Sequence, residues 1–164
     1  MNLDNLQSEI DKIKLIRPKL KNIILESKKI IILGNGGSNA IASHISVDYN
    51  KWLKIPTLSF SDSPMLTAYI NDFGIEEAYK QFLINFASPD TFIILISSSG
   101  NSMNIINAAK YCEENKIKYA SLSGFSFNNK LNNMDANFKY HVNYNSYGVV
   151  EIAHETLLHS IVKN

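Results

Sequence analysis

Short apolar runs alternate with helical stretches along this chain, and that alternation restricts its fold more than any other feature. The runs predicted to be strands are residues 29–33, 57–60, 91–96, 117–123 and 138–143. Apolar residues recur at helical spacing over residues 38–52, 75–86, 102–115 and 148–162. Strands that are apolar throughout need cover on both faces, and strands that alternate with helices form parallel sheets. We therefore predict an α/β fold, a three-layer sandwich around a five-stranded parallel sheet.

An N-terminal helical segment precedes the sheet. We assign residues 1–27 to this segment and residues 28–164 to the α/β core of a single domain. Pro18 is expected to kink the helix or to restart it. Because the helices between the strands already cover the sheet, we expect the segment to contact another subunit of a homo-oligomer. The alternative is that it packs back on its own domain.

Composition excludes several classes of protein. The 164 residues suit one domain, and 16 basic against 15 acidic residues give no global field that would attract nucleic acid or a membrane. Cys112 is the only cysteine, which excludes an internal disulfide. The charged N-terminus resembles neither a signal peptide nor a membrane span, so we expect a cytoplasmic protein.

The first segment with chemical potential is GNGGSNA, residues 34–40, between a predicted strand and a helix. Its glycines permit a sharp turn and close approach to a ligand, and Ser38 can cap a helix whose free N–H groups attract an anion. It departs from the dinucleotide pattern G-x-G-x-x-G, because Asn39 stands at the third glycine. A tight turn that binds nothing explains this segment equally well.

The second segment is SSSGNS, residues 97–102, which again ends a strand and opens a helix. Several serine hydroxyls and backbone N–H groups converge there, an arrangement suited to phosphate. A flavin phosphate loop would follow the first strand, whereas this turn follows the third. Both turns should meet at the carboxyl edge of a parallel sheet, where ligands bind. Arg17 is the only arginine and lies far from both turns in sequence, so hydroxyls and N–H groups are the expected phosphate ligands.

Ionisable residues recur at four-residue spacing on two predicted helices. His44 and Asp48 share one helix face, while Glu151, Glu155 and His159 share another. Such a set could hold a divalent, zinc-like metal or act as acid and base. Ordinary surface charge on two amphipathic helices is the alternative explanation.

In combination, these segments resemble the SIS family of sugar-phosphate isomerases and binding domains, and within it the sedoheptulose 7-phosphate (phosphoheptose) isomerases. The resemblance rests on GNGGSNAIASH, NDFG, SSSGNS and EIAHETLLH, in that order along the chain. It implies the flavodoxin-like SIS fold and a homotetramer or dimer with active sites between subunits. It also implies that the N-terminal helix takes part in the subunit contacts.

The resemblance also implies site residues. Substrate and phosphate contacts are expected from Asn35, Gly36, Gly37, Ser38, Asn71, Asp72, Ser97, Ser98, Ser99, Ser102 and Glu151. A divalent metal, expected to be Zn²⁺, would be held by His44, Asp48, Glu151 and His159. Asp48 is expected to act as the base or a metal-bound carboxylate, with His159 as its acid–base partner. Asp48 stands where these isomerases have Glu, and Glu151 where they have Gln.

The predicted function is aldose–ketose isomerisation of a phosphorylated sugar, with sedoheptulose 7-phosphate as the expected substrate. The altered residues at positions 48 and 151 favour an alternative, a non-catalytic SIS protein that senses a sugar phosphate or serves as an adaptor in replication initiation. A nucleotide- or flavin-binding module is a further alternative that neither turn fits well. No direct contact with nucleic acid or membrane is expected.

Overall fold

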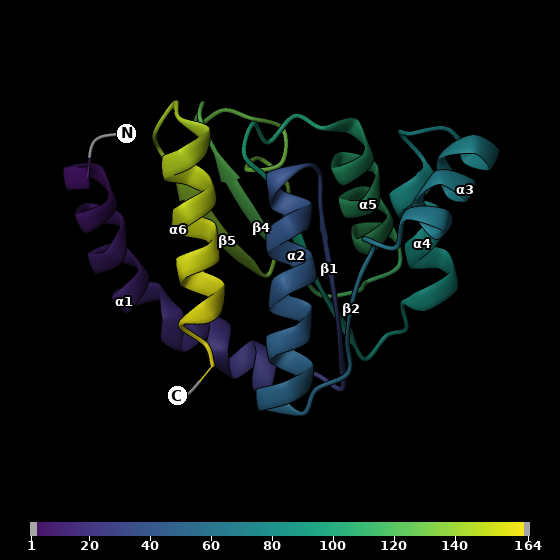
Figure 1. Cartoon of the computed structure of the whole chain (residues 1–164), viewed down its shortest axis with the longest axis horizontal. Coiled ribbons are helices and arrows are strands. Elements are labelled where there is room, and N and C mark those ends of the chain that lie inside the picture. Colours follow the sequence, from purple (N-terminus) through teal and green to yellow (C-terminus); the bar gives the residue numbers. More distant parts are fainter. Residues whose placement is uncertain (1–2, 163–164) are drawn as a thin grey trace.

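The computed structural model describes residues 3–162, and side chains from residue 6 onward. Five parallel strands form one sheet in the order β2-β1-β3-β4-β5 (Figure 1). The strands are β1 (Lys29–Gly34), β2 (Thr57–Ser59), β3 (Thr91–Ser97), β4 (Tyr119–Gly124) and β5 (Phe138–Val142). The helices are α1 (Leu3–Glu26), α2 (Gly37–Asp48), α3 (Ser63–Phe73), α4 (Ala78–Phe86), α5 (Met103–Glu114) and α6 (Tyr147–His159), with the π-helical turn η1 (Tyr49–Leu53) after α2.

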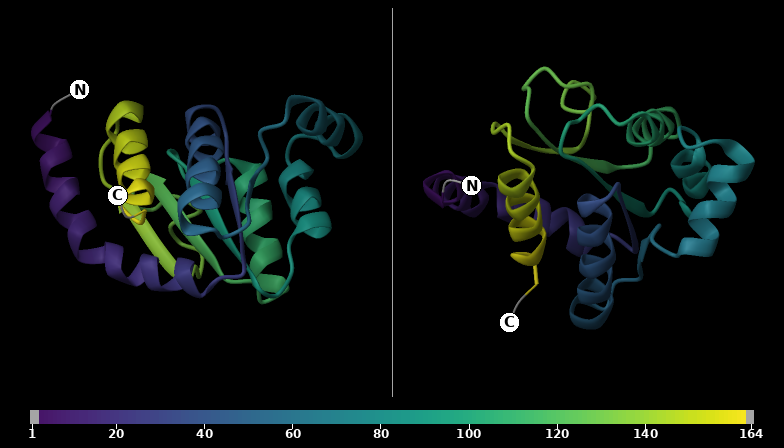
Figure 2. Two further views of the ribbon diagram at one scale, coloured as in Figure 1. Left: turned by 60° about the horizontal axis from the view of Figure 1, so that its bottom comes forward. Right: turned by 45° about the horizontal axis from the view of Figure 1, so that its top comes forward.

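Alternating side chains of the strands point to opposite faces of the sheet and pack in two separate hydrophobic layers. Ile30 and Ile32 of β1 pack in the layer under α1, α2 and α6. Ile31 and Leu33 point to the opposite face, under α4 and α5. All four are fully buried, and each such side chain stabilises the fold by roughly 1.5–3 kcal/mol. The predicted three-layer sandwich is therefore confirmed, and Figure 2 shows helices on both sides of the sheet.

The strand predictions are correct in number and place, whereas the helices between β2 and β3 differ from expectation. Helix α3 is absent from the sequence prediction, although Asp62 caps it by accepting a hydrogen bond from the N–H of Met65 and Pro64 occupies its first turn. Gly74, with φ of 78°, ends it. The helix predicted over 75–86 is α4, which starts at Ala78.

Helix α1 runs through Pro18 without ending and bends along its length (Figure 2). Leu20 and Ile24 are fully buried in its own domain's core, against the layer that includes α6. The expectation that the helices between the strands already cover the sheet is therefore wrong. The face of α1 that carries Leu20 and Ile24 packs on its own domain, which was the alternative arrangement. Arg17 Nε donates to the carbonyl of Ser160 at 2.6 Å, which ties α1 to the end of α6. No helix in residues 3–162 is both long and apolar enough to cross a bilayer.

Polar contacts of α1 close the open edge of the sheet at β5. Lys12 Nζ donates to the main-chain carbonyl of His141, which an edge strand would otherwise leave free. Tyr140 donates its hydroxyl proton to the buried carboxylate of Glu9 at 2.6 Å. Burial, with a smaller contribution from this carboxylate, raises the pKa of Tyr140. The edge strand is therefore covered by charged and hydrogen-bonded groups of α1.

One prediction concerns His154, which is fully buried on α6 and contacts the carbonyl of Ser123 through Nε2 at 3.1 Å. Burial lowers the pKa of His154 to about 4, so between pH 4 and 6.5 the unfolded chain binds a proton that the folded chain does not. Its contribution to stability is therefore lost as pH falls through this window, by roughly 3 kcal/mol in total. His154→Gln keeps a donor for Ser123 but cannot titrate.

Urea unfolding at pH 7 and at pH 4 measures this effect. The stability advantage of the wild type over His154→Gln should shrink by about 3 kcal/mol on acidification. An advantage that stays constant across the two pH values would show that His154 is not a buried neutral histidine.

Candidate active site

The turn after β1 is shaped by two glycines. A Cβ on Gly34 would lie 2.6 Å from the carbonyl carbon of Ser38, so only glycine allows the strand to approach α2 so closely. Gly36 has a φ of 53° and precedes the first residue of α2. Tyr79 donates its hydroxyl proton to the Gly34 carbonyl at 2.7 Å, and burial raises its pKa to about 12, which keeps it a neutral donor. The close packing at Gly34 and the Tyr79 hydrogen bond thus hold the turn after β1 rigidly.

The turn after β3 carries the serines. Ser97 ends the strand, Ser102 is the N-cap of α5, and their hydroxyl oxygens lie 3.3 Å apart. Gly100 has a φ of 65°, and a Cβ there would lie 1.9 Å from Oδ1 of Asn129. The amide N–H of Leu131 donates to the Gly100 carbonyl at 2.9 Å. The loop after β4 therefore supports the serine turn, a role that sequence patterns did not indicate for its asparagines.

The two turns meet because β1 and β3 are neighbours in the sheet. Asn35 and Asn104 join them through a reciprocal pair of side-chain hydrogen bonds, 2.9 and 2.8 Å long. Beside this pair lies a pocket of about 140 Å³, well above the space one water molecule needs. Its polar lining comes from Asn35, Ser38, Ser97, Ser98, Ser99, Ser102, Tyr147 and Glu151.

This pocket offers donors suited to an anion. Helices α2, α5 and α6 all begin beside it, and none of their N-cap residues makes a side-chain capping bond. Free N–H groups of a first helical turn carry partial positive charge. The hydroxyl of Ser98 is buried and has no hydrogen-bond partner among the described residues. Because Ser98 lines the pocket, this unused hydroxyl is available to a ligand group there.

Glu151 occupies the pocket beside these donors. A Cβ built on Gly37 would lie 2.5 Å from Oε1 of Glu151, so the carboxylate packs directly on the first residue of α2. A carboxylate is stabilised at the positive end of a helix. Glu151 thus adds a negative charge to a pocket that otherwise presents donors.

A second group of ionisable side chains lies farther along α2 and α6. This cluster consists of His44, Asp48 and His159. Nδ1 of His159 lies 3.2 Å from Oδ2 of Asp48, and Nε2 of His44 lies 3.9 Å from the same oxygen. The hydroxyl of Tyr49 donates to the Leu158 carbonyl at 3.0 Å and fixes the end of α2 against α6. The spacing seen in sequence thus becomes a real convergence of two histidines and one carboxylate.

The cluster fits a divalent metal by its donor set. One ligand atom from each of His44, Asp48 and His159 lies within 4.8 Å of the others. Two imidazoles and one carboxylate are the ligands of many catalytic zinc sites, which keep a fourth position for water or substrate. Glu151, the fourth ligand expected from sequence, is not part of this group and lies in the serine-lined pocket instead.

Other expected residues lie elsewhere in this chain. Asn71 and Asp72 sit at the exposed end of α3, bonded to one another at 3.0 Å, and line no part of the serine pocket. Their role in binding remains a prediction. Sequence reasoning did not single out Tyr147 as a lining residue or Asn104 as the bridge between the turns.

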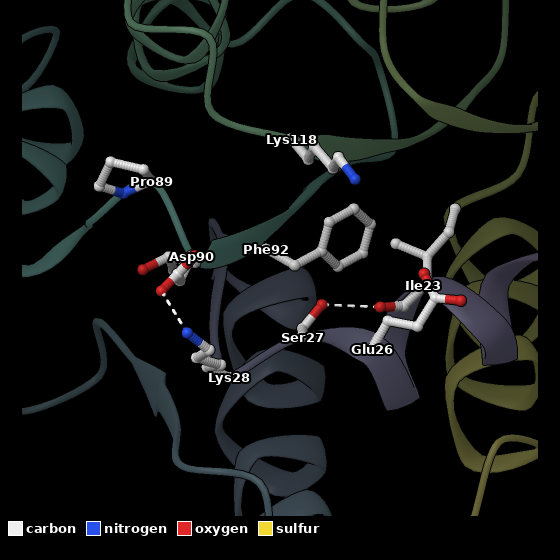
Figure 3. Close-up of a pocket in the computed structure, with 9 residues that line it drawn as sticks. Ile23, Glu26, Ser27, Lys28, Pro89, Asp90, Phe92 and Lys118 are labelled. Atoms are coloured by element: carbon white, nitrogen blue, oxygen red, sulfur yellow. Dashed lines mark hydrogen bonds and ion pairs between the residues drawn. The ribbon is translucent and has the colours of Figure 1, made fainter.

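A different hollow, of about 160 Å³, lies at the opposite edge of the sheet, where β1 and β3 begin (Figure 3). An ion pair between Lys28 and Asp90, 2.9 Å long, borders it, and Phe92 points into it. Parallel α/β sheets bind ligands at the carboxyl ends of their strands. The hollow of Figure 3 is at the amino ends, so the serine pocket is the candidate site.

Fold and site together define the class. A model of the SIS domain family matches residues 3–124, and the chain belongs to this family. A phosphoheptose isomerase of Buchnera aphidicola is 34% identical over 115 residues, which are 67% of this chain and 58% of that protein. A phosphoheptose isomerase of Fusobacterium nucleatum is 29% identical over 153 residues, covering 90% of this chain and 78% of that protein.

The fold is also that of a solved phosphoheptose isomerase. The structure of GmhA from Neisseria gonorrhoeae superposes with a TM-score of 0.89 at 23% identity, over 97% of this chain and 89% of that one. The present chain spans 58% of the length of the Buchnera protein. The match to the SIS domain over residues 3–124 establishes the family, and the superposition establishes the fold.

A prediction about the serine turn uses Gly100. Gly100→Ala should lower the free energy of unfolding by about 2 kcal/mol or more, because it adds strain at positive φ and a clash with Asn129. Gly100→Ala in an Asn129→Gly background is the matched comparison, because the strain at positive φ stays while the Asn129 side-chain atoms that the new Cβ would meet are gone. Gly100→Ala should cost about 1 kcal/mol less there than in the wild type. Equal costs of Gly100→Ala in the two backgrounds, measured by chemical denaturation, would show that Asn129 does not brace the turn.

Proposed function

We propose that this chain is a sugar-phosphate aldose–ketose isomerase that acts on sedoheptulose 7-phosphate. One observation carries the proposal: α2 and α6 hold an anion pocket at one end and a histidine–carboxylate cluster at the other. The names of the relatives agree with it, because both the Buchnera and the Fusobacterium proteins are phosphoheptose isomerases. The retained pair His44 and His159 favours an enzyme over an adaptor, which needs no such cluster.

The separation of the two sites suits a long sugar. Glu151 at the pocket and His159 at the cluster are eight residues apart on α6, or ~12 Å along the helix axis. An extended chain advances ~1.2 Å per bond, so C1 of an open-chain heptose 7-phosphate lies ~10 Å from its phosphorus. The same distance in a pentose 5-phosphate is only ~7 Å. With phosphate in the serine pocket, the C1–C2 end of the longer sugar would come within ~2 Å of the level of the cluster along the helix, whereas a pentose 5-phosphate would end ~5 Å short of it.

The phosphate would be bound by hydroxyls and helix N–H groups. Ser97, Ser98, Ser99 and Ser102 are the proposed contacts, with Ser38 from the other turn. Hydrogen bonds to a charged group contribute on the order of 1.5–3 kcal/mol each. The negative charge of Glu151 opposes phosphate binding. We therefore propose that Glu151 accepts hydrogen bonds from the sugar hydroxyls next to the phosphate.

The isomerisation requires a base for the proton beside the carbonyl and a partner that moves protons between the two oxygens. Asp48 is the proposed base and His159 its partner, 3.2 Å away. His44, Asp48 and His159 would hold a divalent ion, proposed to be zinc, which when bound polarises the carbonyl as a Lewis acid. Asp48 has two oxygens, so it can contact the ion through one and exchange a proton through the other.

The proposed enzyme is a homo-oligomer. Leu15 on α1 is 82% exposed, and Val47 and Trp52 at the end of α2 are 50% and 61% exposed. Exposed apolar side chains of this size are available for contact with another chain. A second copy of this chain is the proposed occupant, as a dimer or tetramer, and light scattering of the purified protein tests it. A cytoplasmic location is part of the same proposal.

The function is tested by following interconversion of sedoheptulose 7-phosphate and its aldose isomer. We expect turnover by the purified chain, at least tenfold loss after treatment with a chelator, and recovery when zinc is restored. Ribulose 5-phosphate should be turned over more slowly because its chain is shorter. Tight binding of a heptulose phosphate without turnover would favour the sensor, and no turnover of any sugar phosphate would refute the isomerase.

Substitutions in the serine pocket should lower the affinity for the phosphorylated sugar, whereas substitutions in the cluster should lower turnover. Ser99→Ala combined with Ser102→Ala should weaken sedoheptulose 7-phosphate at least tenfold by calorimetry, because two bonds to a charged group are lost. Unphosphorylated sedoheptulose should bind the variant as it binds the wild type. His159→Ala should abolish turnover yet keep affinity within about threefold, since it lies two helical turns from the phosphate. Unchanged affinity in the double serine variant would show that SSSGNS is only a structural turn.

A further inference from the structure

The imidazole of His159 is flanked by a carboxylate at each ring nitrogen. Nδ1 lies 3.2 Å from Oδ2 of Asp48, on the side of the cluster. Nε2 lies 3.6 Å from Oε1 of Glu155, on the other side. Glu155 is one turn before His159 on α6 and belongs neither to the three-residue metal group nor to the serine pocket. Its position calls for an explanation separate from both sites.

The two carboxylates compete for the single N–H of a neutral imidazole. A ring that donates from Nδ1 to Asp48 has no lone pair directed at the cluster. A ring that donates from Nε2 to Glu155 presents its Nδ1 lone pair to Asp48 and His44 instead. Only the second arrangement lets Nδ1 bind a cation, because a metal ligand needs a deprotonated nitrogen.

A cation in the cluster would decide this competition. Its charge would engage the Asp48 carboxylate and remove that group as an acceptor for the ring N–H. Glu155 then becomes the remaining acceptor close to the ring. A metal-bound histidine whose other nitrogen donates to a carboxylate is the usual arrangement of such ligands.

We propose that Glu155 is a positioning residue that holds the proton of His159 on Nε2 and directs Nδ1 to the metal. The proposal rests on the metal-assisted site under Proposed function, but not on the identity of the sugar. The side chain of Glu155 is 42% exposed, so it can move the short distance that turns a 3.6 Å ion pair into a hydrogen bond. Glu155 does not itself bind the metal, because His159 stands between it and Asp48.

Zinc affinity of the folded chain provides the first test. Glu155→Ala should weaken zinc binding 10- to 100-fold in a competition titration with a chelating dye, the range typical when the partner of a ligating histidine is lost. Glu155→Gln should recover part of this loss, because its carbonyl oxygen can still accept from Nε2. Glu114→Gln is the matched control, an exposed glutamate near the end of another helix, α5, and should bind zinc like the wild type.

The ring itself provides a readout that a purely structural role would not move. In nitrogen-resolved NMR spectra, zinc should convert His159 of the wild type to the form protonated on Nε2 with Nδ1 metal-bound, and this conversion should be incomplete in Glu155→Ala. A metal bound through Nε2, a wild type that binds no zinc, or a Glu155→Ala variant with unchanged affinity would overturn the proposal. Because none of these readouts uses sugar turnover, a missing isomerase activity would refute the proposed reaction while leaving this assignment standing.

Discussion

The parallel pairing of β1 with β3 at the centre of the sheet is the constraint on which the site depends. Its register runs from Lys29 opposite Thr91 to Gly34 opposite Ile96, so both strands end at the same level. The chain leaves β1 toward α2 on one face and leaves β3 toward α5 on the other. This reversal opens a crevice between the two turns, at the place where open parallel sheets bind their ligands. The hydrogen bonds between Asn35 and Asn104 then join the two sides of the crevice.

The packing of α2 beside α6 converts one crevice into an extended site. Both helices begin at the crevice, and the contact of Glu151 with Gly37 fixes their near ends. Tyr49 and Leu158 fix the far ends through a buried hydrogen bond. Between these contacts the helices act as a rigid spacer of about two turns. In the proposed reaction, this spacer would set how far the phosphate group lies from the reacting carbonyl, and helix geometry would be a determinant of sugar length.

Carboxylates are unusually dense along this pair of helices. Glu151 and Glu155 lie on α6, and Asp48 lies at the end of α2 beside them, 3.2 Å from His159. Three negative groups around a bound dianion are unfavourable unless each has a compensating partner. The start of α2 compensates Glu151, and the imidazole of His159 lies between the other two. A divalent cation in the cluster would compensate the negative charge that the imidazole leaves on Asp48 and Glu155, so charge balance favours a metal there.

Local sequence determined the strands, most helices and the character of both turns. Burial on both faces demands apolar strands such as the one at 91–97, and glycine and serine at strand ends leave few other conformations. Sequence spacing also predicted that His44 and Asp48 share a helix face. It could not show that Asp48 meets His159 across two helices, because strand order and helix packing depend on contacts between distant residues. The same reason explains why Asn129 under Gly100, Tyr147 at the pocket and the burial of α1 against its own core emerged only from the tertiary structure.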